Sequence, residues 1–241
     1  MYEAFLRCHQ NLAIGVLYSL WRHVHSRRAE IYILAASCIF VSTLVLEVSF
    51  ILFRNVAFSR IGSRALISRH NGVIRMTIFV TRPWKPKGGE YVNIWMPSAS
   101  FWSILQSHPF MIASSSHGPK ASIDLVIEPQ RGFTQKLFHL AEDYQKEQTA
   151  IGRTEQPFGF SRCHPGNPEA TDYHQVILSG PHGKTYQFGE YDQILLFAEG
   201  VGIAALLQFL NELTHKIHRG QFRTRRVSVF WQLQQLGKCS P

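Results

Sequence analysis

Apolar residues are concentrated in the first quarter of the chain, where they form two long runs. Residues 31–53 (IYILAASCIFVSTLVLEVSFILF) contain one formal charge, that of Glu47. A helix needs about 20 apolar residues to cross the hydrocarbon core of a bilayer, so this run predicts a transmembrane helix. Residues 3–25 predict a preceding helix, also apolar. It carries polar side chains of the kind that face a bundle interior or a cofactor at membrane depth: Arg7, His9, Gln10 and Asn11.

Beyond Gly62 the pattern changes to short alternating runs separated by turn residues. Residues 65–80 (ALISRHNGVIRMTIFV) predict two strands that form a hairpin around His70, Asn71 and Gly72. A helix is predicted from about Thr134, and residues 145–172 lack any period, which predicts a loop insertion. Together with further predicted strands, the hairpin indicates a small antiparallel barrel. Those strands lie at residues 91–96, 108–116, 121–129 and 174–180.

The period changes again near the C-terminus. Residues 193–198 (QILLFA) form a continuous apolar run, which is typical of a buried parallel strand. A glycine turn and an amphipathic helix come next (EGVGIAALLQFLNELTHKIH), and residues 225–233 (RRVSVFWQL) predict another apolar strand. Strand, glycine turn, helix and strand make a βαβ unit of the kind found in nucleotide-binding domains.

The chain is basic, with a net charge of +9 and a pI near 9.6. Such a balance fits nucleic acid, an anionic membrane surface or anionic cofactors such as nucleotides. The pattern contains no recognition helix or base-reading module, so we expect no nucleic-acid partner. The arginines after the apolar helix predict that the rest of the chain is cytoplasmic: Arg54, Arg60, Arg64 and Arg69. The cysteines are too far apart to predict a zinc site or a disulfide framework: Cys8, Cys38, Cys163 and Cys239.

Three short motifs carry candidate chemistry, and each has two interpretations. SHPFMIAS (107–114) suits a flat aromatic ligand against a strand end, or it is a strand entered through a proline. RGFT (131–134) offers helix N-terminal amides and an arginine to a phosphate, or it begins an ordinary capped helix. Gly200 and Gly202 allow a dinucleotide to approach the backbone, or they form a tight strand-to-helix turn.

Two histidines of the first helix are candidate metal ligands. His9 and His23 are 14 residues apart, which in an α-helix places them on nearly the same face, about 21 Å apart along the axis. Neutral imidazole is an axial ligand of haem iron, so the pair predicts one haem towards each side of the membrane. The alternative is a pair of interfacial histidines near the helix ends.

In their order and spacing, these motifs resemble those of the fungal ferric-chelate reductases, within the flavocytochrome group that includes the NADPH oxidases. HPFMIAS resembles the family's flavin motif HPFT with its small-residue strand, and GPHG (180–183) resembles GPYG. LLFAEGVGIAALL resembles the nucleotide turn AGGxGIT. YEAFLRCHQNLAIGVLYSLWRH resembles the helix that carries one histidine for each of two stacked haems. The resemblance covers nearly the whole chain.

The resemblance implies membrane α-helices followed by a ferredoxin-reductase-type module, an antiparallel FAD-binding β-barrel plus a partial α/β nucleotide-binding domain. Residues 1–58 would be two transmembrane helices, 59–185 the FAD-binding barrel with the insertion at 145–172, and 186–241 the NADPH-binding domain. His9 and His23 would each hold one haem b. The implied contacts for FAD are His108, Pro109, Phe110, Met111, Ile112, Ala113, Ser114, Arg131, Gly132, Phe133 and Thr134. Those for NADPH are Gly180, Gly183, Gly200, Gly202 and Ile203.

The implied reaction passes a hydride from NADPH to FAD. Single electrons then cross the membrane through two haems to extracellular ferric chelates, which supports iron uptake. The expected partners are ferric chelates, NADPH and membrane lipid, and the expected location is the plasma membrane, with the flavin domain in the cytoplasm. Two alternatives are an NADPH oxidase that reduces oxygen to superoxide and a truncated, non-catalytic flavin-binding membrane protein.

The chain also departs from the family pattern. The family has more membrane helices before Met1 and more of the nucleotide fold after the last residue, so we expect a chain truncated at both ends, with one protein ligand for each haem iron. Glu199 stands where the family usually has glycine, and a carboxylate beside a pyrophosphate is unfavourable. Met111 and Ala204 replace hydroxyl residues, which removes two hydrogen-bonding groups.

Overall fold

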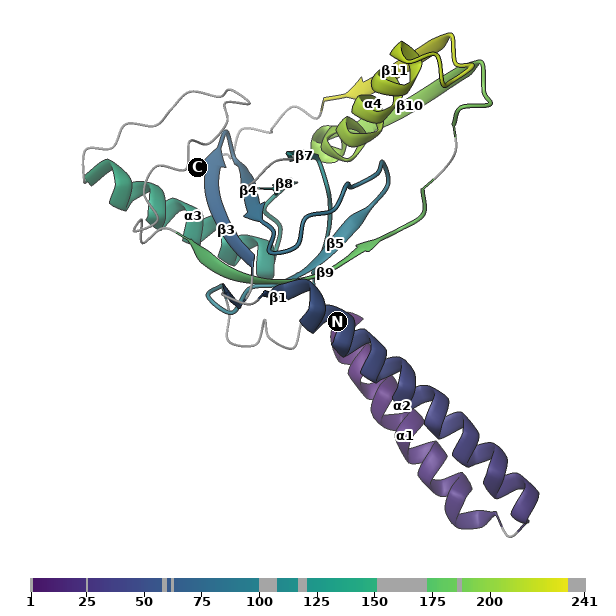
Figure 1. Cartoon of the computed structure of the whole chain (residues 1–241). Helices are drawn as coiled ribbons and strands as arrows, with labels where there is room; N and C mark the ends of the chain where they lie inside the picture. The colour runs from purple at the N-terminus through teal and green to yellow at the C-terminus, as the bar shows by residue number, and fades with distance from the viewer. Residues whose placement is uncertain are drawn as a thin grey trace. The chain divides into compact units, whose positions relative to one another are not determined.

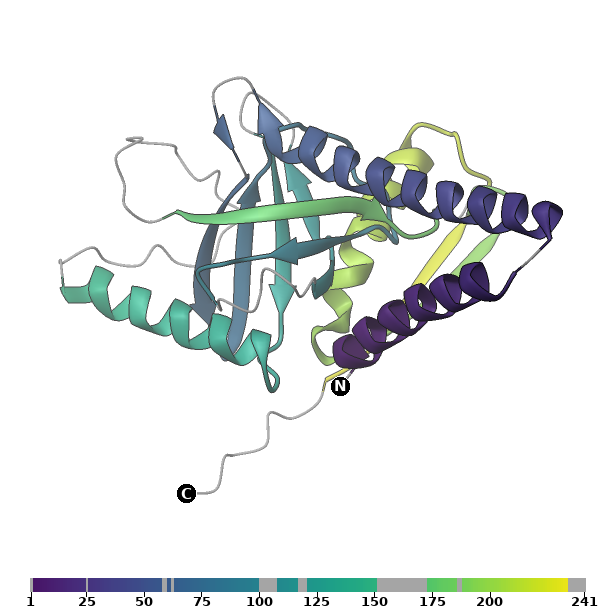
Figure 2. The ribbon, with the colours of Figure 1, turned by 90° about the horizontal axis from the view of Figure 1, so that it is seen from below.

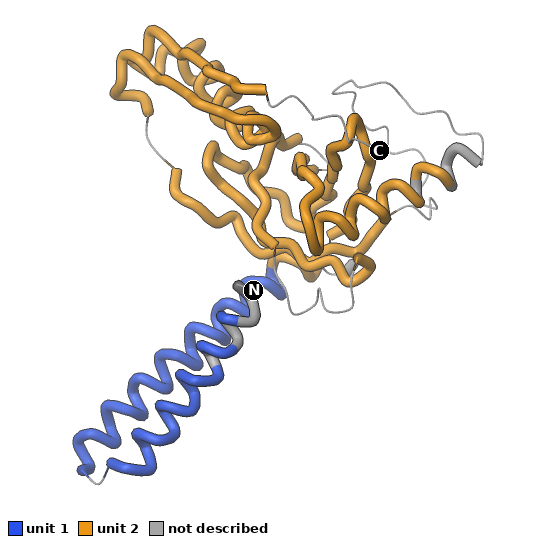
Figure 3. Tube along the Cα trace, turned by 180° about the vertical axis from the view of Figure 1, so that it is seen from behind, with its two compact units in different colours: residues 1–53 blue, residues 54–241 orange. Residues whose placement is uncertain are grey.

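A computed structural model describes most of the chain and divides it into two compact units, residues 1–53 and 54–241 (Figure 3). The described residues are 2–24, 26–57, 60–61, 63–99, 108–116, 121–150, 173–185 and 188–233.

The first unit consists of two helices, α1 (Tyr2–His23) and most of α2 (Arg27–Asn55). Both predicted helices are present, and α2 begins four residues before the apolar run because Arg27 to Glu30 are good helix formers. Among the helices in the described residues, only α2 is long and apolar enough to cross a membrane. Its apolar side chains are exposed within the chain, as at Leu46, which is 68% exposed.

The second unit is built around a seven-stranded sheet in which every neighbouring pair of strands is antiparallel (Figures 1 and 2). The strand order is β6-β5-β9-β3-β4-β8-β7. The strands are β3 (Ser63–His70), β4 (Val73–Phe79), β5 (Tyr91–Trp95), β6 (His108–Met111), β7 (Ser114–Ser116), β8 (Ser122–Ile127) and β9 (His174–His182). Before them, β1 (Val56–Ala57) pairs with β2 (Arg60–Ile61).

The predicted hairpin joins β3 to β4. Asn71 and Gly72 both have positive φ angles, 46° and 80°, and His70 pairs directly with Val73. A two-residue turn of this kind needs positive φ at both positions, which asparagine and glycine tolerate best. The prediction at this position is confirmed.

The prediction of a single strand over residues 108–116 is wrong, and the difference explains how the barrel closes. The structure has two strands, β6 and β7, at opposite edges of the strand order. Between them, the Ile112 amide donates to Glu90 O (3.3 Å) and the Ala113 amide donates to Asp124 O (2.9 Å). One bent segment therefore serves both edges, because curling the sheet around a core brings those edges together.

The barrel core is formed by alternating apolar residues of the strands and by one face of α3 (Phe133–Ala150). On that face, Phe133, Leu137 and Ala141 are buried at a spacing of four residues, which is one helical turn. The helix begins one residue before the predicted start. It continues through Ala150, so the loop predicted at 145–172 is wrong over its first six residues, and the rest lies outside the described residues.

The predicted βαβ unit is present at the C-terminal end. It comprises β10 (Gln193–Glu199), the short 3-10 turn η2 (Gly200–Gly202), α4 (Ile203–His218) and β11 (Arg226–Gln232), and the two strands are parallel. The prediction that 193–198 is a buried strand is wrong. Ile194 is buried, but Leu195 and Phe197 are 57% and 71% exposed, because only one face of this two-stranded sheet is covered within the described residues.

Candidate functional site

The strand HPFM and the turn RGFT, which are 20 residues apart in the sequence, form one surface. The ring of His108 on β6 stacks on the ring of Phe133 at the start of α3, with centroids 3.9 Å apart and planes 8° apart. Phe110 lies on the same side, 6.3 Å from Phe133 between centroids. Because Phe133 is anchored in the barrel core, the stack fixes the beginning of α3 against β6.

Burial affects both the charge and the hydrogen bonding of the His108 ring. Burial lowers the pKa of His108 below its ordinary value, so the ring is uncharged at neutral pH. Its Nε2 is buried and has no hydrogen-bond partner among the described residues. An unsatisfied buried polar atom costs about 1–3 kcal/mol, so this nitrogen is suited to a group that binds here.

At the RGFT turn, the side chain of Thr134 is already engaged. Its Oγ1 accepts a hydrogen bond from the Gln130 amide (2.8 Å) and donates to Gln130 O (3.2 Å), so this hydroxyl caps the turn. Gly132 has φ +91°, and a Cβ there would meet nothing within 4 Å. Arg131 is exposed beside it. The turn therefore presents open backbone and a cation at a helix N-terminus, the usual setting for an anion.

The other residues of HPFMIAS divide between the barrel core and its outer face. Ile112 and Ala113 are buried, at 1% and 3% exposure, so only their backbone is available to a ligand. Ser114 donates its hydroxyl hydrogen to Asp124 Oδ2 (2.8 Å). Pro109 and Met111 lie exposed on β6.

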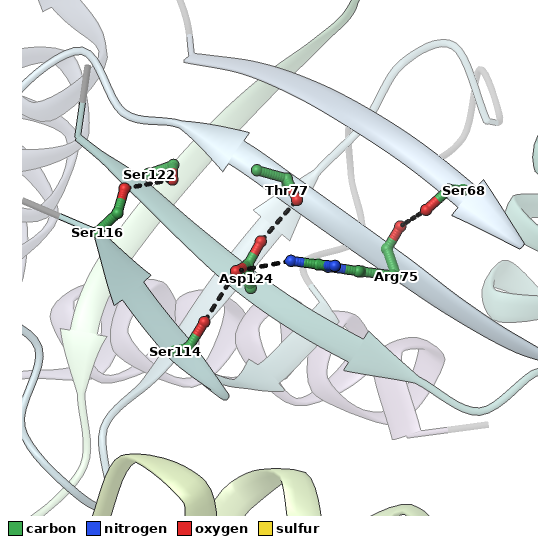
Figure 4. A network of polar contacts seen from close by, with 7 residues as sticks. All are labelled: Ser68, Arg75, Thr77, Ser114, Ser116, Ser122 and Asp124. Carbon is green, nitrogen blue, oxygen red and sulfur yellow. Dashed lines mark hydrogen bonds and ion pairs between the residues drawn. The ribbon is translucent and has the colours of Figure 1, made fainter. Parts of the chain in front are cut away.

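Asp124 is the centre of a polar network that sequence analysis did not predict (Figure 4). Its register partners Thr77 on β4 and Ser114 on β7 both donate hydroxyl hydrogens to it, and Arg75 forms an ion pair with it at 3.3 Å. Strand alternation puts all four side chains on the outer face of the barrel. In the sequence, the only signal for this network is that Asp124 is an acidic residue at an outward-facing position of an alternating strand.

The GPHG segment ends β9 and is fixed by a side chain from the end of α2. The Arg54 guanidinium donates twice to Gly180 O, from Nε (3.0 Å) and Nη2 (2.8 Å), and it also lies over the ring of Trp84. Gly180 and Gly183 have φ of +132° and +107°, which glycine alone adopts readily.

The next residue strengthens this attachment. The side-chain amide of Asn55 exchanges two hydrogen bonds with the backbone of Leu178, at 2.7 and 2.9 Å, and Asn55 is buried. In the sequence, Arg54 is recognisable only as a membrane-flanking charge and Asn55 carries no signal, because nothing local shows that their partners lie over 120 residues away.

Gly202 of the EGVG turn is exposed, whereas Gly200 is half-buried and its carbonyl accepts a hydrogen bond from Trp231 Nε1 (2.9 Å). A Cβ on Gly200 or Gly202 would meet nothing within 4 Å, and Ile203 begins α4 directly after them. An open groove of about 470 Å³ lies at the carboxyl ends of the two parallel strands, where ligands of α/β sheets usually bind. It is lined by Phe197, Ala198, Glu199, Phe230, Trp231 and Gln232.

His9 and His23 both lie on α1, as predicted for residues of one helix. His23 Nδ1 donates a hydrogen bond to Ser19 O (2.8 Å), because a carbonyl oxygen only accepts. His9 stacks on Phe5 with centroids 6.0 Å apart. Within the described residues, no three histidine, cysteine or acidic side chains gather as a metal-binding group.

Residues 63–186, over half of the chain, match the family described as FAD-binding domain. The chain is 24% identical over 263 residues to the ferric/cupric reductase transmembrane component 2 of Schizosaccharomyces pombe, covering 98% of this chain and 43% of that protein. It is 23% identical to the ferric reductase transmembrane component 1 of the same organism (95% and 41%). For the ferric/cupric reductase transmembrane component 2 of Saccharomyces cerevisiae, the identity is 25% (84% and 24%).

The chain spans less than half the length of these curated relatives. Among solved structures, it is similar to the ferredoxin reductase in carbazole 1,9a-dioxygenase, with 13% identity, a TM-score of 0.48 and coverage of 71% of this chain and 42% of that one. For the ferredoxin-NADP+ reductase from Plasmodium falciparum, the identity is 13%, the TM-score is 0.42, and the coverage is 76% of this chain and 63% of that one. The chain therefore belongs to the family of FAD-binding domains, and the curated relatives that it matches along most of its length are fungal ferric reductases.

Proposed function

We propose that this chain is part of a membrane ferric-chelate reductase, which passes electrons from NADPH through FAD and haem to ferric iron across the membrane and so supports iron uptake. The observation that carries the proposal is the joined surface of HPFM and RGFT inside a matched FAD-binding domain. The names of the curated relatives support ferric iron as the acceptor.

The residues on this surface fit FAD. His108 Nε2 offers an unused hydrogen-bonding atom beside a stacked aromatic pair, and the open backbone at Gly132 leaves room for an anionic group next to Arg131. We propose that His108 and Phe110 contact the flavin side of the cofactor and that the RGFT amides with Arg131 hold its diphosphate. When bound, FAD accepts a hydride and releases electrons one at a time.

The NADPH assignment rests on two glycine segments. Gly180 and Gly183 shape the end of β9, and Gly200 and Gly202 leave space beside the backbone, where a Cβ would meet nothing, at the carboxyl ends of parallel strands. Glu199 lines the same groove, and a carboxylate there favours a hydroxyl over a phosphate as its neighbour. We propose that the ribose or nicotinamide side of NADPH lies nearest to Glu199.

We propose that His9 and His23 each hold one haem b on α1. The hydrogen bond from His23 Nδ1 to Ser19 O favours this role, because metal-ligating histidines usually donate their other ring N–H to a carbonyl or carboxylate. Residues 1–58 would then be the membrane domain, 59–185 the flavin domain and 186–241 the NADPH domain. The proposed location is the plasma membrane, with the flavin domain in the cytoplasm.

Membranes from cells that express the chain test this function directly. Ferrous iron formed from a ferric chelate after addition of NADPH is trapped with a coloured chelator, and superoxide is followed separately. Reduction of the chelate above membranes without the chain, and its loss in Gly132→Asp, supports the proposal, because an aspartate at this turn repels the diphosphate. Superoxide as the sole product would overturn the ferric assignment, and a flavin-loaded chain that reduces neither acceptor would overturn the catalytic one.

A further inference from the structure

Residues 86–90, here called the double-glycine loop, lie between β4 and β5 and are bound by helix α4. Gln208 Nε2 donates to Pro86 O (2.8 Å), and the Gly88 amide donates to Glu212 Oε2 (3.0 Å). Gln208 is buried at 7% exposure. Gln208 and Glu212, which are one turn apart on α4, therefore both bind backbone atoms of the loop.

The same face of α4 leaves no space for a side chain at Gly88 or Gly89. A Cβ on Gly88 would lie under 3.0 Å from three atoms of the Phe209 ring, and one on Gly89 would lie 2.9 Å from the end of that ring. Real Cβ atoms essentially never come so close, so both positions require glycine while Phe209 stays in place.

The loop also packs against the end of the GPHG segment. A Cβ on Gly183 would lie 2.5 Å from Gly89 O, and a Cβ on Gly89 would lie 3.0 Å from Lys184 O. The backbone of the loop therefore contacts both α4 and the end of GPHG, and the absence of a Cβ at Gly89 lets Phe209 and Lys184 O both lie close to it.

Two hydrogen bonds within the loop also join Lys87 to Glu90. Glu90 Oε2 accepts from the Lys87 amide (3.0 Å), and the Glu90 amide donates to Lys87 O (3.2 Å). Glu90 O accepts from the Ile112 amide, directly after HPFM. The loop is therefore also attached to the residue directly after HPFM, through the Glu90 carbonyl and not through Gly88.

We propose that Gly88 and Gly89 are positioning residues that set the separation between GPHG and the helix after the EGVG turn, and thereby the width of the NADPH site. This inference rests on the proposed function, because it takes both glycine segments to be the two sides of that site. The double-glycine loop itself need not touch the nucleotide. The absence of Cβ atoms at Gly88 and Gly89 determines how closely α4 and GPHG can lie to the loop.

The test is a Gly88→Ala variant of the full chain in mild detergent, with the Kd for NADP+ measured by titration and the Kd for FAD measured separately. The added methyl group pushes Phe209 and α4 away from the loop. We expect this displacement to raise the Kd for NADP+ about tenfold, which corresponds to a loss of about 1.4 kcal/mol of binding free energy. The Kd for FAD should stay within about twofold, since no residue of HPFM or RGFT is changed.

A second variant separates the spacer role from a general loss of stability. Phe209→Ala removes the ring that the new methyl group would strike, so the double variant Gly88→Ala/Phe209→Ala should bind NADP+ at least as tightly as Phe209→Ala alone. If the single changes acted only by destabilising the chain, the double variant would bind NADP+ more weakly than either single variant. Binding as tight as that of Phe209→Ala alone therefore indicates the steric contact between position 88 and the Phe209 ring. If Gly88→Ala raises the Kd for NADP+ by the same factor in the wild type and in Phe209→Ala, the proposal is overturned.

Gly89 has a matched control in Gly72. Their φ angles are +88° and +80°, so alanine causes similar backbone strain at each, but a Cβ at Gly72 meets nothing within 4 Å. We expect Gly89→Ala to weaken NADP+ binding and Gly72→Ala to leave it unchanged. If wild-type chain with FAD bound shows no NADP+ binding, the proposed function fails; if it binds and Gly88→Ala binds equally well, only this inference fails.

Discussion

His108 combines a structural cost with a proposed role in binding the flavin. Its ring stacks on Phe133, and burial keeps it neutral by lowering its pKa. Because the folded-state pKa lies below the unfolded value, the unfolded chain binds the proton more readily. The contribution of a neutral His108 to stability is therefore present above its ordinary pKa of 6.5 and is lost as the pH falls below that value.

We expect His108→Phe, which keeps the stacked ring, to reduce this loss of stability at acid pH. The measurement is the thermal unfolding midpoint of the full chain in detergent between about pH 7.5 and about pH 5.5, which brackets the ordinary pKa by about one unit on each side. His174 has a pKa lowered by burial in the same way, so part of the pH dependence should remain in the variant. An unchanged pH profile in His108→Phe would contradict the account, and His139→Phe, at an exposed position on α3, is the control.

Asp124 should be worth more to stability than an exposed acidic residue. Hydrogen bonds to charged groups contribute about 1.5–3 kcal/mol, and Asp124 accepts two from hydroxyls besides its ion pair with Arg75. We expect Asp124→Asn to lower the free energy of unfolding by about 1–3 kcal/mol in denaturant titrations. Asp192→Asn breaks only an exposed pair with Arg223 and should cost about 0–1 kcal/mol. Equal effects of the two changes would contradict the larger contribution assigned to Asp124.

At the scale of elements, α3 links the barrel core to the proposed diphosphate contact. Leu137 is fully buried one turn after Phe133, so Leu137→Ala should cost about 2–5 kcal/mol of stability. Because the RGFT turn begins the same helix, the change should also weaken FAD binding, as measured by fluorescence titration. Leu207→Ala on α4, where the leucine is 37% exposed, should have a smaller effect on both quantities. Unaltered FAD affinity in a destabilised Leu137→Ala variant would separate α3 from the flavin site.

The attachment of α4 to the double-glycine loop should depend on pH through Glu212. Burial by itself would raise the pKa of Glu212. Hydrogen bonds from Lys216 and the Gly88 amide, with the charges of Lys216 and Lys87, outweigh it, so the pKa lies below its ordinary value of 4.5. The stabilisation by Glu212 is therefore present above pH 4.5 and is lost as the pH falls through the lower folded-state value. The difference in unfolding midpoint between wild type and Glu212→Gln should be largest near neutral pH and should vanish in acid; a difference that persists there would contradict this.

The sequence predicted the elements whose signals are local. The hairpin at Asn71 and Gly72 needs only two residues with positive φ, and the βαβ unit is indicated by a glycine turn between two apolar runs. The split of residues 108–116 into two strands could not be predicted, because it depends on the closing of the barrel between Glu90 and Asp124.

In the candidate site too, the motifs could be predicted from neighbouring residues, whereas the contacts between distant residues could not. HPFM and RGFT were identified from their own residue types, and the structure brings them into contact. The bonds of Arg54 and Asn55 to β9, and those of α4 to the double-glycine loop, join residues more than 100 positions apart. Such contacts are decided by tertiary packing, on which a single sequence carries no direct signal.

At the scale of the whole molecule, the account requires the flavin surface and the NADPH segments to work on one electron path. All of their residues lie in the second compact unit, whereas His9 and His23 lie in the first. Flavin reduction by NADPH therefore tests the second unit alone, and haem reduction tests the coupling of both. The two signals absorb at different wavelengths and can be measured in one sample.

The most direct measurement is the visible absorption spectrum of the full chain purified in mild detergent, recorded before and after addition of NADPH without oxygen. The account predicts a flavin band that bleaches on addition of NADPH and, where haem is bound, a Soret band that shifts as the iron is reduced. A chain that is folded and supplied with FAD, yet shows no flavin band, would contradict the central claim that the joined surface of HPFM and RGFT holds the flavin.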